Sequence, residues 1–66
     1  MWKKYSLVGI DGNAYAIMGY VSKCMRKEGY NQTRIDKYCN DAMSGDYNHL
    51  LQVSIKMIDE LNGLAR

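Results

Sequence analysis

Apolar residues recur at helical spacing along most of the chain after residue 13. In the first such stretch, the residues that follow the i, i+3, i+4, i+7 spacing of an amphipathic helix are Ala14, Ile17, Met18, Val21, Cys24 and Met25. This pattern predicts a helix from about Asn13 to Glu28. Gly29 suits the left-handed position after a helix end, and Lys27 in the last turn favours the same boundary.

The same spacing predicts a second and a third helix. The second covers about residues 32 to 43 with Asn31 as its N-cap, and its apolar face consists of Ile35, Tyr38, Cys39, Ala42 and Met43. The turn Ser44-Gly45 ends it. Asp46 then caps a third helix that runs from about Tyr47 to Asn62, and we expect Gly63 to stop it.

The third helix is apolar over more of its circumference than a small core requires. Its apolar residues spread over roughly 200° at about 100° per residue, whereas a stripe of about 100° suffices for a helix on one side of a core. These residues are Leu50, Leu51, Val53, Ile55, Met57, Ile58, Leu61 and Leu64. Either the helix is central or its second face contacts another subunit. With only three helices in the chain, we favour a subunit contact.

Residues 1–10 (MWKKYSLVGI) do not follow a helical repeat. Tyr5, Leu7, Val8 and Ile10 favour an extended conformation, and a single strand is not stable alone. We therefore expect an extended arm over residues 1–10, which lies across the helices or pairs with its copy in another subunit. An all-α three-helix domain should follow over residues 11–66.

Two glycine-containing loops, residues 11–13 and 44–46, precede predicted helix starts. Short connections favour antiparallel neighbours, so both loops should lie at one end of the molecule, where two helix N-termini attract anions. In one interpretation, Asp11 or Asn13 and Asp46 already satisfy these termini as caps. In the other, the glycines let a ligand approach the backbone closely. Gly19, which is unfavourable inside a helix, suggests a close helix approach.

Length and composition restrict the class of protein. A chain of 66 residues buries only about 60% of the surface that its unfolded form exposes. Cys24 and Cys39 show no zinc-site spacing and are too few for a disulfide framework, so we expect a homo-oligomer to supply stability. A net charge of +2 is too small for a nucleic-acid footprint. No stretch predicts a signal peptide or a membrane span, so we expect a cytoplasmic location.

Candidate catalytic and metal-binding groups are sparse. His49 is the only histidine, and Ser44 and Asp46 lie near it in sequence, but nothing resembles a nucleophile elbow. No paired acid and base is visible, so we predict no catalytic residue. The loop at residues 11–13 lacks the spacing and terminal Glu of a calcium loop, so we predict no metal and no cofactor.

A helix-turn-helix arrangement is compatible with the tight turn between the second and third helices. In that arrangement Asn48, His49, Gln52 and Lys56 would face a major groove. The helix that carries them is largely apolar and bears acidic residues that phosphates repel. Nucleic acid is therefore a less favoured partner.

The chain is rich in tyrosine, with six of them and one tryptophan. We expect Tyr38 and Tyr15 in the core. The remaining tyrosines fall on the arm, at helix ends or at the edge of the apolar face, where we favour oligomer contacts over base stacking. They are Tyr5, Tyr20, Tyr30 and Tyr47.

Two motifs, DGNAYAIMG at 11–19 and SGDYNHLL at 44–51, resemble a widespread family of short phage and prophage proteins. The basic end of the first helix and Gly29-Tyr30 lie between them, and the resemblance extends from about Val8 to Leu61. Small oligomeric phage proteins include sponges that sequester the cyclic nucleotides of bacterial anti-phage signalling, and the chain is similar to such an anti-CBASS sponge. The resemblance implies a non-enzymatic immune-evasion protein in the host cytoplasm.

A sponge needs a pocket that holds phosphates and stacks bases, and oligomerisation can build one. The resemblance thus implies a ligand site formed by Asn13, Tyr15, Arg26, Ser44, Tyr47 and His49. Tyr15, Tyr47 or Trp2 would stack on bases, and Arg26, Lys3 or Lys4 would meet phosphate. The charges of Asp11 and Asp46 oppose phosphate unless they cap helices or bind base N–H donors. The alternative is a protein-binding inhibitor or interaction module that uses the apolar face of the third helix.

Overall fold

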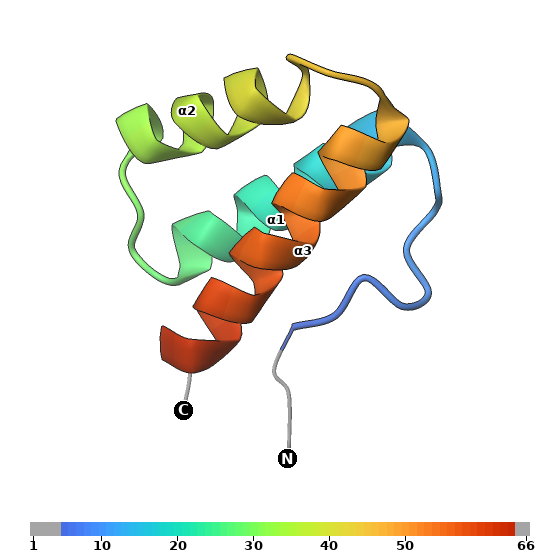
Figure 1. Ribbon diagram of the computed structural model, residues 1–66. Helices are drawn as coiled ribbons and strands as arrows, with labels where there is room; N and C mark the ends of the chain where they lie inside the picture. Colours follow the sequence, from blue (N-terminus) through green and yellow to red (C-terminus); the bar gives the residue numbers. More distant parts are fainter. Residues whose placement is uncertain (1–4, 65–66) are drawn as a thin grey trace.

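Three helices form the fold in the computed structural model, which describes residues 5–64 and, of Leu64, only the backbone. They are α1 (Ala14–Lys27), α2 (Gln32–Ala42) and α3 (Tyr47–Leu64). α1 and α3 begin at the same end of the molecule, and α2 runs in the opposite direction (Figure 1). The described residues contain no strand. The prediction of an all-α, three-helix chain is confirmed.

The start of α1 is fixed by side chains of the first glycine-containing loop. The side-chain oxygen of Asn13 accepts from the backbone N–H of Tyr15 at 2.8 Å, so Asn13 is the N-cap. Asp11 acts one step earlier, because its carboxylate accepts from the backbone N–H of Asn13 at 3.0 Å. Gly29 has a φ of +88° after the helix end, as the sequence predicts.

The other two helices are capped in the same way. The side-chain oxygen of Asn31 accepts from the backbone N–H of Arg34 at 2.9 Å, which starts α2. The carboxylate of Asp46 accepts from the backbone N–H of His49 at 2.9 Å, which starts α3. Both predicted caps are confirmed, and each satisfies one N–H that a helix start leaves free.

The core lies between the three helices and contains side chains from each of them. Its buried apolar residues are Tyr5, Ile17, Met18, Val21, Cys24, Met25, Ile35, Tyr38, Ala42, Leu50, Ile58 and Leu61. Tyr38 is in the core as predicted. The prediction for Tyr15 is wrong, because Tyr15 is 75% exposed. At about 100° per residue it lies about 200° from Ile17, on the opposite side of α1.

The broad apolar surface of α3 is largely covered within the chain. α3 packs against both α1 and α2, and its residue Asn62 binds the N-terminal segment. Among the described residues of this predicted apolar surface, Ile55 is the one large side chain that is exposed, at 50%. The central position of α3 therefore accounts for most of the width of this apolar surface, for which the sequence alone favours a subunit contact.

The described part of the N-terminal segment packs on the helices. Tyr5 is only 4% exposed, so it belongs to the core of its own chain and not to the expected oligomer contact. The side-chain amide of Asn62 accepts from the Tyr5 N–H at 2.8 Å and donates to the Tyr5 carbonyl at 3.0 Å. A turn breaks the expected extended path, with Ile10 N–H donating to the Leu7 carbonyl at 3.1 Å and Gly9 at φ +85°. Residues 1–4 of the expected arm lie outside the described residues.

Two glycines occupy helix interiors. Gly63 does not stop α3, which continues to Leu64, so that predicted boundary is wrong. The two hydrogen bonds between the Asn62 side chain and the backbone of Tyr5 hold this last turn of α3 in place. Outside the backbone of its own helix, no atom of a described residue lies within 4 Å of the position that a Cβ of Gly19 would occupy. The expected close helix approach at Gly19 is therefore not made by the described helices of this chain.

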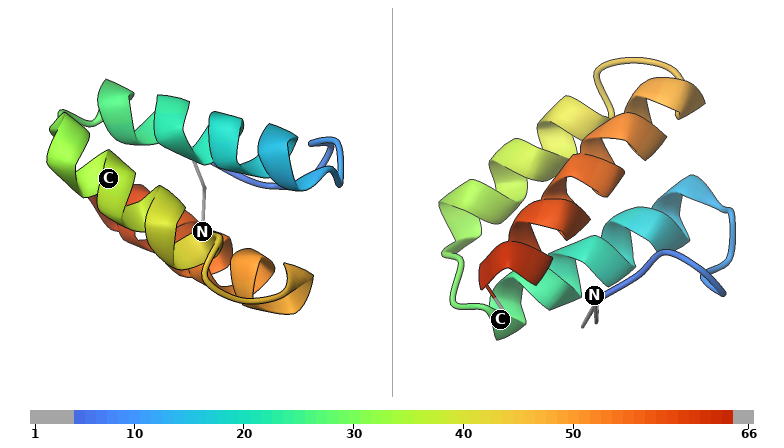
Figure 2. Two further views of the ribbon diagram at one scale, coloured as in Figure 1. Left: turned by 90° about the horizontal axis from the view of Figure 1, so that it is seen from above. Right: turned by 60° about the horizontal axis from the view of Figure 1, so that its bottom comes forward.

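The molecule is thin, with principal extents of 31 × 26 × 15 Å. The two views of Figure 2 show α1 beside the pair formed by α2 and α3. None of the helices in the described part of the chain is long and apolar enough to cross a membrane.

Candidate binding cleft

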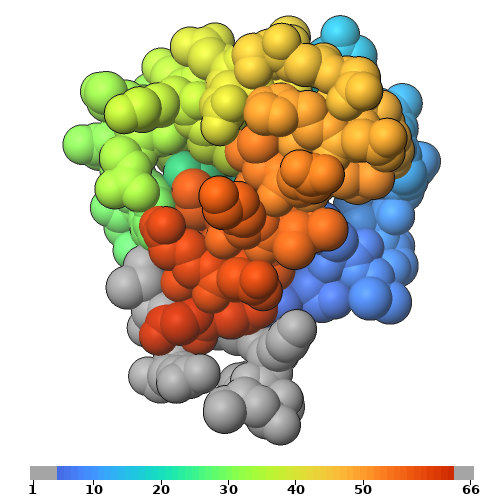
Figure 3. Space-filling model, viewed as in Figure 1, coloured from blue at the N-terminus to red at the C-terminus, as the bar shows by residue number. Residues whose placement is uncertain are grey.

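The two glycine-containing loops meet at one end of the molecule, as the sequence predicts. The hydroxyl of Tyr47, in the first turn of α3, donates a hydrogen bond to the backbone carbonyl of Gly12. The beginnings of α1 and α3 therefore lie side by side, and the end of α2 completes this part of the surface (Figure 3).

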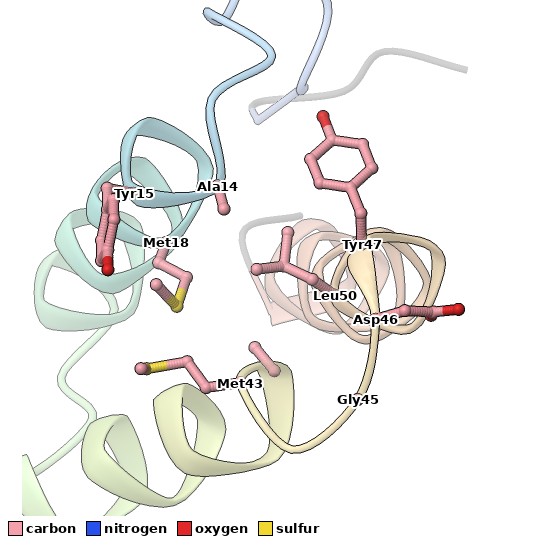
Figure 4. A pocket seen from close by; sticks show the side chains of 9 residues that line it. Ala14, Tyr15, Met18, Met43, Gly45, Asp46, Tyr47 and Leu50 are labelled. Atoms are coloured by element: carbon pink, nitrogen blue, oxygen red, sulfur yellow. The ribbon is translucent and has the colours of Figure 1, made fainter.

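An apolar cleft of about 270 Å³ opens between these three helix ends. Its lining consists of Ala14, Tyr15, Met18, Ala42, Met43, Gly45, Asp46, Tyr47 and Leu50. Met18 points into the cleft from α1, Leu50 from α3 and Met43 from the end of α2 (Figure 4). The carboxylate of Asp46 points away from it (Figure 4). We call this site the loop-end cleft.

Exposed apolar side chains gather around the loop-end cleft. Five large apolar side chains are exposed in the described part of the chain, and three of them line this cleft. Tyr15 is 75% exposed, Met43 60% and Tyr47 45%. Single exposed apolar residues are normal, but a cluster on a concave surface marks a binding site.

Two polar residues predicted for the site do not line the cleft. The side-chain oxygen of Asn13 is engaged as the cap of α1. The hydroxyl of Ser44 donates to the carbonyl of Asp41 at 2.6 Å, where it covers the end of α2. Both side chains therefore stabilise helix ends and do not face the cleft.

His49 also lies outside the cleft, on the other side of the loop before α3. Its Nε2 is 2.9 Å from the carbonyl oxygen of Asp41 and 3.2 Å from a carboxylate oxygen of the same residue. Both are acceptors, so Nε2 carries a proton and donates. The hydroxyl of Ser44 is 3.4 Å from this same nitrogen. A catalytic relay instead uses the two ring nitrogens for different partners.

Arg26 lies far from the cleft within one copy of the chain. It is in the last turn of α1, and at 1.5 Å per residue it stands about 18 Å along the helix from Ala14. Its guanidinium contacts the side-chain oxygen of Gln32 at 3.4 Å. Tyr15 and Tyr47 are thus the two predicted site residues that the fold brings to the cleft.

The electrostatic surroundings of the loop-end cleft are neutral to acidic. No Lys or Arg is among the described residues that line it. Asp46 belongs to its lining, and the exposed Asp11 lies in the adjoining loop. A phosphate inside the cleft would lack a cation from the described part of the same copy. No cluster of three potential metal ligands occurs in that part of the chain either.

Two larger hollows elsewhere are lined mainly by polar and charged residues. One, of about 420 Å³ between α2 and α3, is lined by Asp41, His49, Gln52, Val53, Lys56, Met57 and Glu60. It contains three of the residues that a helix-turn-helix arrangement would use, but two carboxylates accompany them and oppose phosphate. The other, of about 520 Å³, lies at the opposite end of the molecule.

That opposite end is organised by a polar cluster around Glu60. The Tyr30 hydroxyl donates to the Glu60 carboxylate, and a guanidinium nitrogen of Arg34 lies 3.3 Å from the same oxygen. The Arg34 guanidinium also stands over the Tyr30 ring, 4.9 Å from its centre. Burial and the hydrogen bond to Glu60 raise the pKa of Tyr30 to about 12. These groups are engaged with one another and stabilise the chain.

No protein family, curated protein or solved structure matches this chain. Its function is therefore inferred from the cleft and its surroundings.

Proposed function

We propose that this chain is a non-enzymatic binding protein whose ligand inserts a flat apolar group into the loop-end cleft. The observation that carries this proposal is the gathering of Tyr15, Met43 and Tyr47 around one concave surface. Burying such side chains gains roughly 25 cal/mol per Å² of apolar area. The described residues that line the cleft offer mainly apolar contact.

In the specific form of this proposal, the ligand is a cyclic nucleotide immune signal and the protein sequesters it. A nucleobase is flat, and the exposed ring of Tyr15 at the rim of the cleft suits base stacking. The resemblance to short phage proteins favours the same ligand class. Because no cation of the described residues lines the cleft, the phosphates would lie outside it.

A thermal-shift panel of cyclic di- and trinucleotides tests this form. A ligand at 100 times its Kd should add about 2.7 kcal/mol to the free energy of unfolding. Met43→Glu should abolish the shift, because it places a charge in the cleft. Ile55→Glu is the matched control, since Ile55 is 50% exposed and lies outside the cleft lining. If no nucleotide raises the melting temperature, nucleotide sequestration is excluded.

The second candidate is a protein partner that inserts an apolar side chain into the same cleft. This differs from the sequence-based alternative, which used the apolar face of the third helix. That face is largely covered by α1, α2 and the N-terminal segment. Met18 and Met43 in the cleft favour this candidate, because flexible thioether side chains adapt to different partners.

A further inference from the structure

We propose that the outer side of α1, which carries the exposed residues Tyr15, Gly19, Lys23 and Arg26, packs antiparallel against α1 of a second copy. The two helices would cross at Gly19. Gly19 is exposed, and the space where its Cβ would stand is open. A glycine in a helix interior is less favourable than alanine, and no contact with another described segment compensates for it. A crossing helix backbone is a contact that glycine permits and a side chain obstructs. No described segment covers the outer side of α1 in the left view of Figure 2.

The charges along this outer side are complementary to themselves in the antiparallel orientation. Lys23, Arg26 and Lys27 are exposed near the end of α1, and no carboxylate of a described residue forms an ion pair with them. Asp11 is exposed just before its beginning. In a pair that crosses at residue 19, residue 26 of one copy lies opposite residue 12 of the other. Arg26 thus approaches Asp11 of the partner copy, whereas a parallel pair would bring like charges together.

The same register places an aromatic ring opposite a cation. Residue 15 of one copy lies opposite residue 23 of the other, so the exposed ring of Tyr15 meets the ammonium group of Lys23. Each contact occurs twice, because the two copies are related by a two-fold axis. The molecule is only 15 Å across in its shortest direction, and this arrangement covers the outer side of α1 with a second helix.

This dimer would also complete the ligand site, a step that rests on the proposed function. Tyr15 borders both the loop-end cleft and the outer side of α1. In one copy the cleft has no Lys or Arg in its described lining. The dimer brings Lys23 and Arg26 of the partner copy to its rim, where they can meet the phosphates of a nucleotide whose base occupies the cleft.

Sedimentation equilibrium of the ligand-free chain tests the dimer. We expect the wild type to dimerise and Gly19→Gln to weaken self-association by about tenfold or more, since a crowded contact loses packing. Gly63→Gln is the matched control, because Gly63 is also an exposed helical glycine with open space around it. A wild type that stays monomeric at its highest soluble concentration overturns the proposal. So does a Gly19→Gln chain that dimerises like the wild type.

Charge reversal tests the orientation independently. Asp11→Arg and Arg26→Asp should each weaken the homodimer by about tenfold or more, because each creates two like-charge contacts. An equimolar mixture of the two variants should dimerise like the wild type, since both contacts are then between opposite charges. Circular dichroism of each variant verifies the helical fold. A mixture that associates no better than the separate variants contradicts the antiparallel register.

The failures of the two proposals are distinguishable. A dimer that no cyclic nucleotide stabilises leaves the α1 contact in place and removes nucleotide sequestration. A nucleotide that binds wild type and Gly19→Gln equally, with both monomeric, removes the α1 contact alone.

Discussion

The hydroxyl of Tyr47 and the carbonyl of Gly12 are joined by a hydrogen bond across 35 positions of the sequence. This bond ties the first turn of α3 to the loop before α1 and holds two walls of the loop-end cleft together. Tyr47 also contributes its ring to the cleft lining. One residue thus links the two loops that carry the sequence motifs.

Removal of this hydroxyl should loosen the loop end without altering the core. We expect Tyr47→Phe to lower the free energy of unfolding by about 0.5–1 kcal/mol, because water can replace the donor at the exposed carbonyl. Amide hydrogen exchange should increase in the loop at residues 11–13. Tyr15→Phe is the control, since the Tyr15 hydroxyl has no hydrogen bond to a described residue. Equal effects of the two substitutions would contradict the role of the Tyr47 hydroxyl.

Substitutions of the two residues that form the buried hydrogen bond between α2 and α3 should have strongly coupled effects on the free energy of unfolding. The hydroxyls of Tyr38 and Ser54 are 2.6 Å apart, and Ser54 is fully buried. Ser54→Ala should cost about 1–3 kcal/mol, because it leaves the Tyr38 hydroxyl without a partner. The double variant Tyr38→Phe/Ser54→Ala should recover part of this loss. Urea unfolding of the four chains measures the coupling, and strictly additive effects would contradict it.

Two glycines should respond to alanine with opposite signs. Gly19→Ala should raise the unfolding free energy of the monomeric chain by about 1 kcal/mol, because the space beside it is open. Gly45→Ala should lower it by about 1–3 kcal/mol, because the added Cβ would lie 2.9 Å from Cβ and Cγ of His49. Urea unfolding of dilute protein checks both. A stabilising Gly45→Ala would show that the loop before α3 is not constrained by His49.

Alkaline pH should destabilise the chain, and Tyr5 should contribute to that loss. Its hydrogen bond to Glu28 and its burial raise the pKa of Tyr5 from 10.0 to about 12. The unfolded chain therefore loses this proton first as pH rises, and above pH 10 it binds fewer protons than the folded chain. The contribution of Tyr5 to stability is therefore complete below pH 10 and is lost between pH 10 and about pH 12. Tyr5→Phe should show a shallower decrease over this interval, by circular dichroism of urea-unfolding series. An equally steep decrease would exclude Tyr5 as a cause.

Helix positions and caps could be predicted because they depend on neighbouring residues. Asn13, Asn31 and Asp46 each bind an N–H two or three positions further along. The predicted end of α3 at Gly63 is wrong because glycine favours a helix end but does not require one. The hydrogen bonds that hold the last turn of α3 join Asn62 to Tyr5, which are 57 positions apart, so no local sequence pattern predicts them.

The candidate site was only partly predictable from sequence. The meeting of the two loops followed from helix direction, and it brought Tyr15 and Tyr47 to the cleft. Helical spacing places the methionines of the cleft on apolar helix faces, but it does not distinguish a filled core position from one at an open junction between helices. Asn13 and Ser44 belong to the site that the resemblance implies, but polar loop residues serve equally well as helix caps and as ligand contacts. The distance of Arg26 from the cleft follows from the length of α1, which separates Arg26 in its last turn from Ala14 in its first.

Methionine-methyl NMR of the wild-type chain, titrated with cyclic di- and trinucleotides, tests the loop-end cleft most directly. Met18 and Met43 line the cleft, whereas Met25 is fully buried in the core and Met57 lines the hollow between α2 and α3. We predict saturable shifts of the Met18 and Met43 resonances, with those of Met25 and Met57 unchanged. Absence of shifts with every nucleotide, or a shift confined to Met57, would contradict nucleotide binding in this cleft.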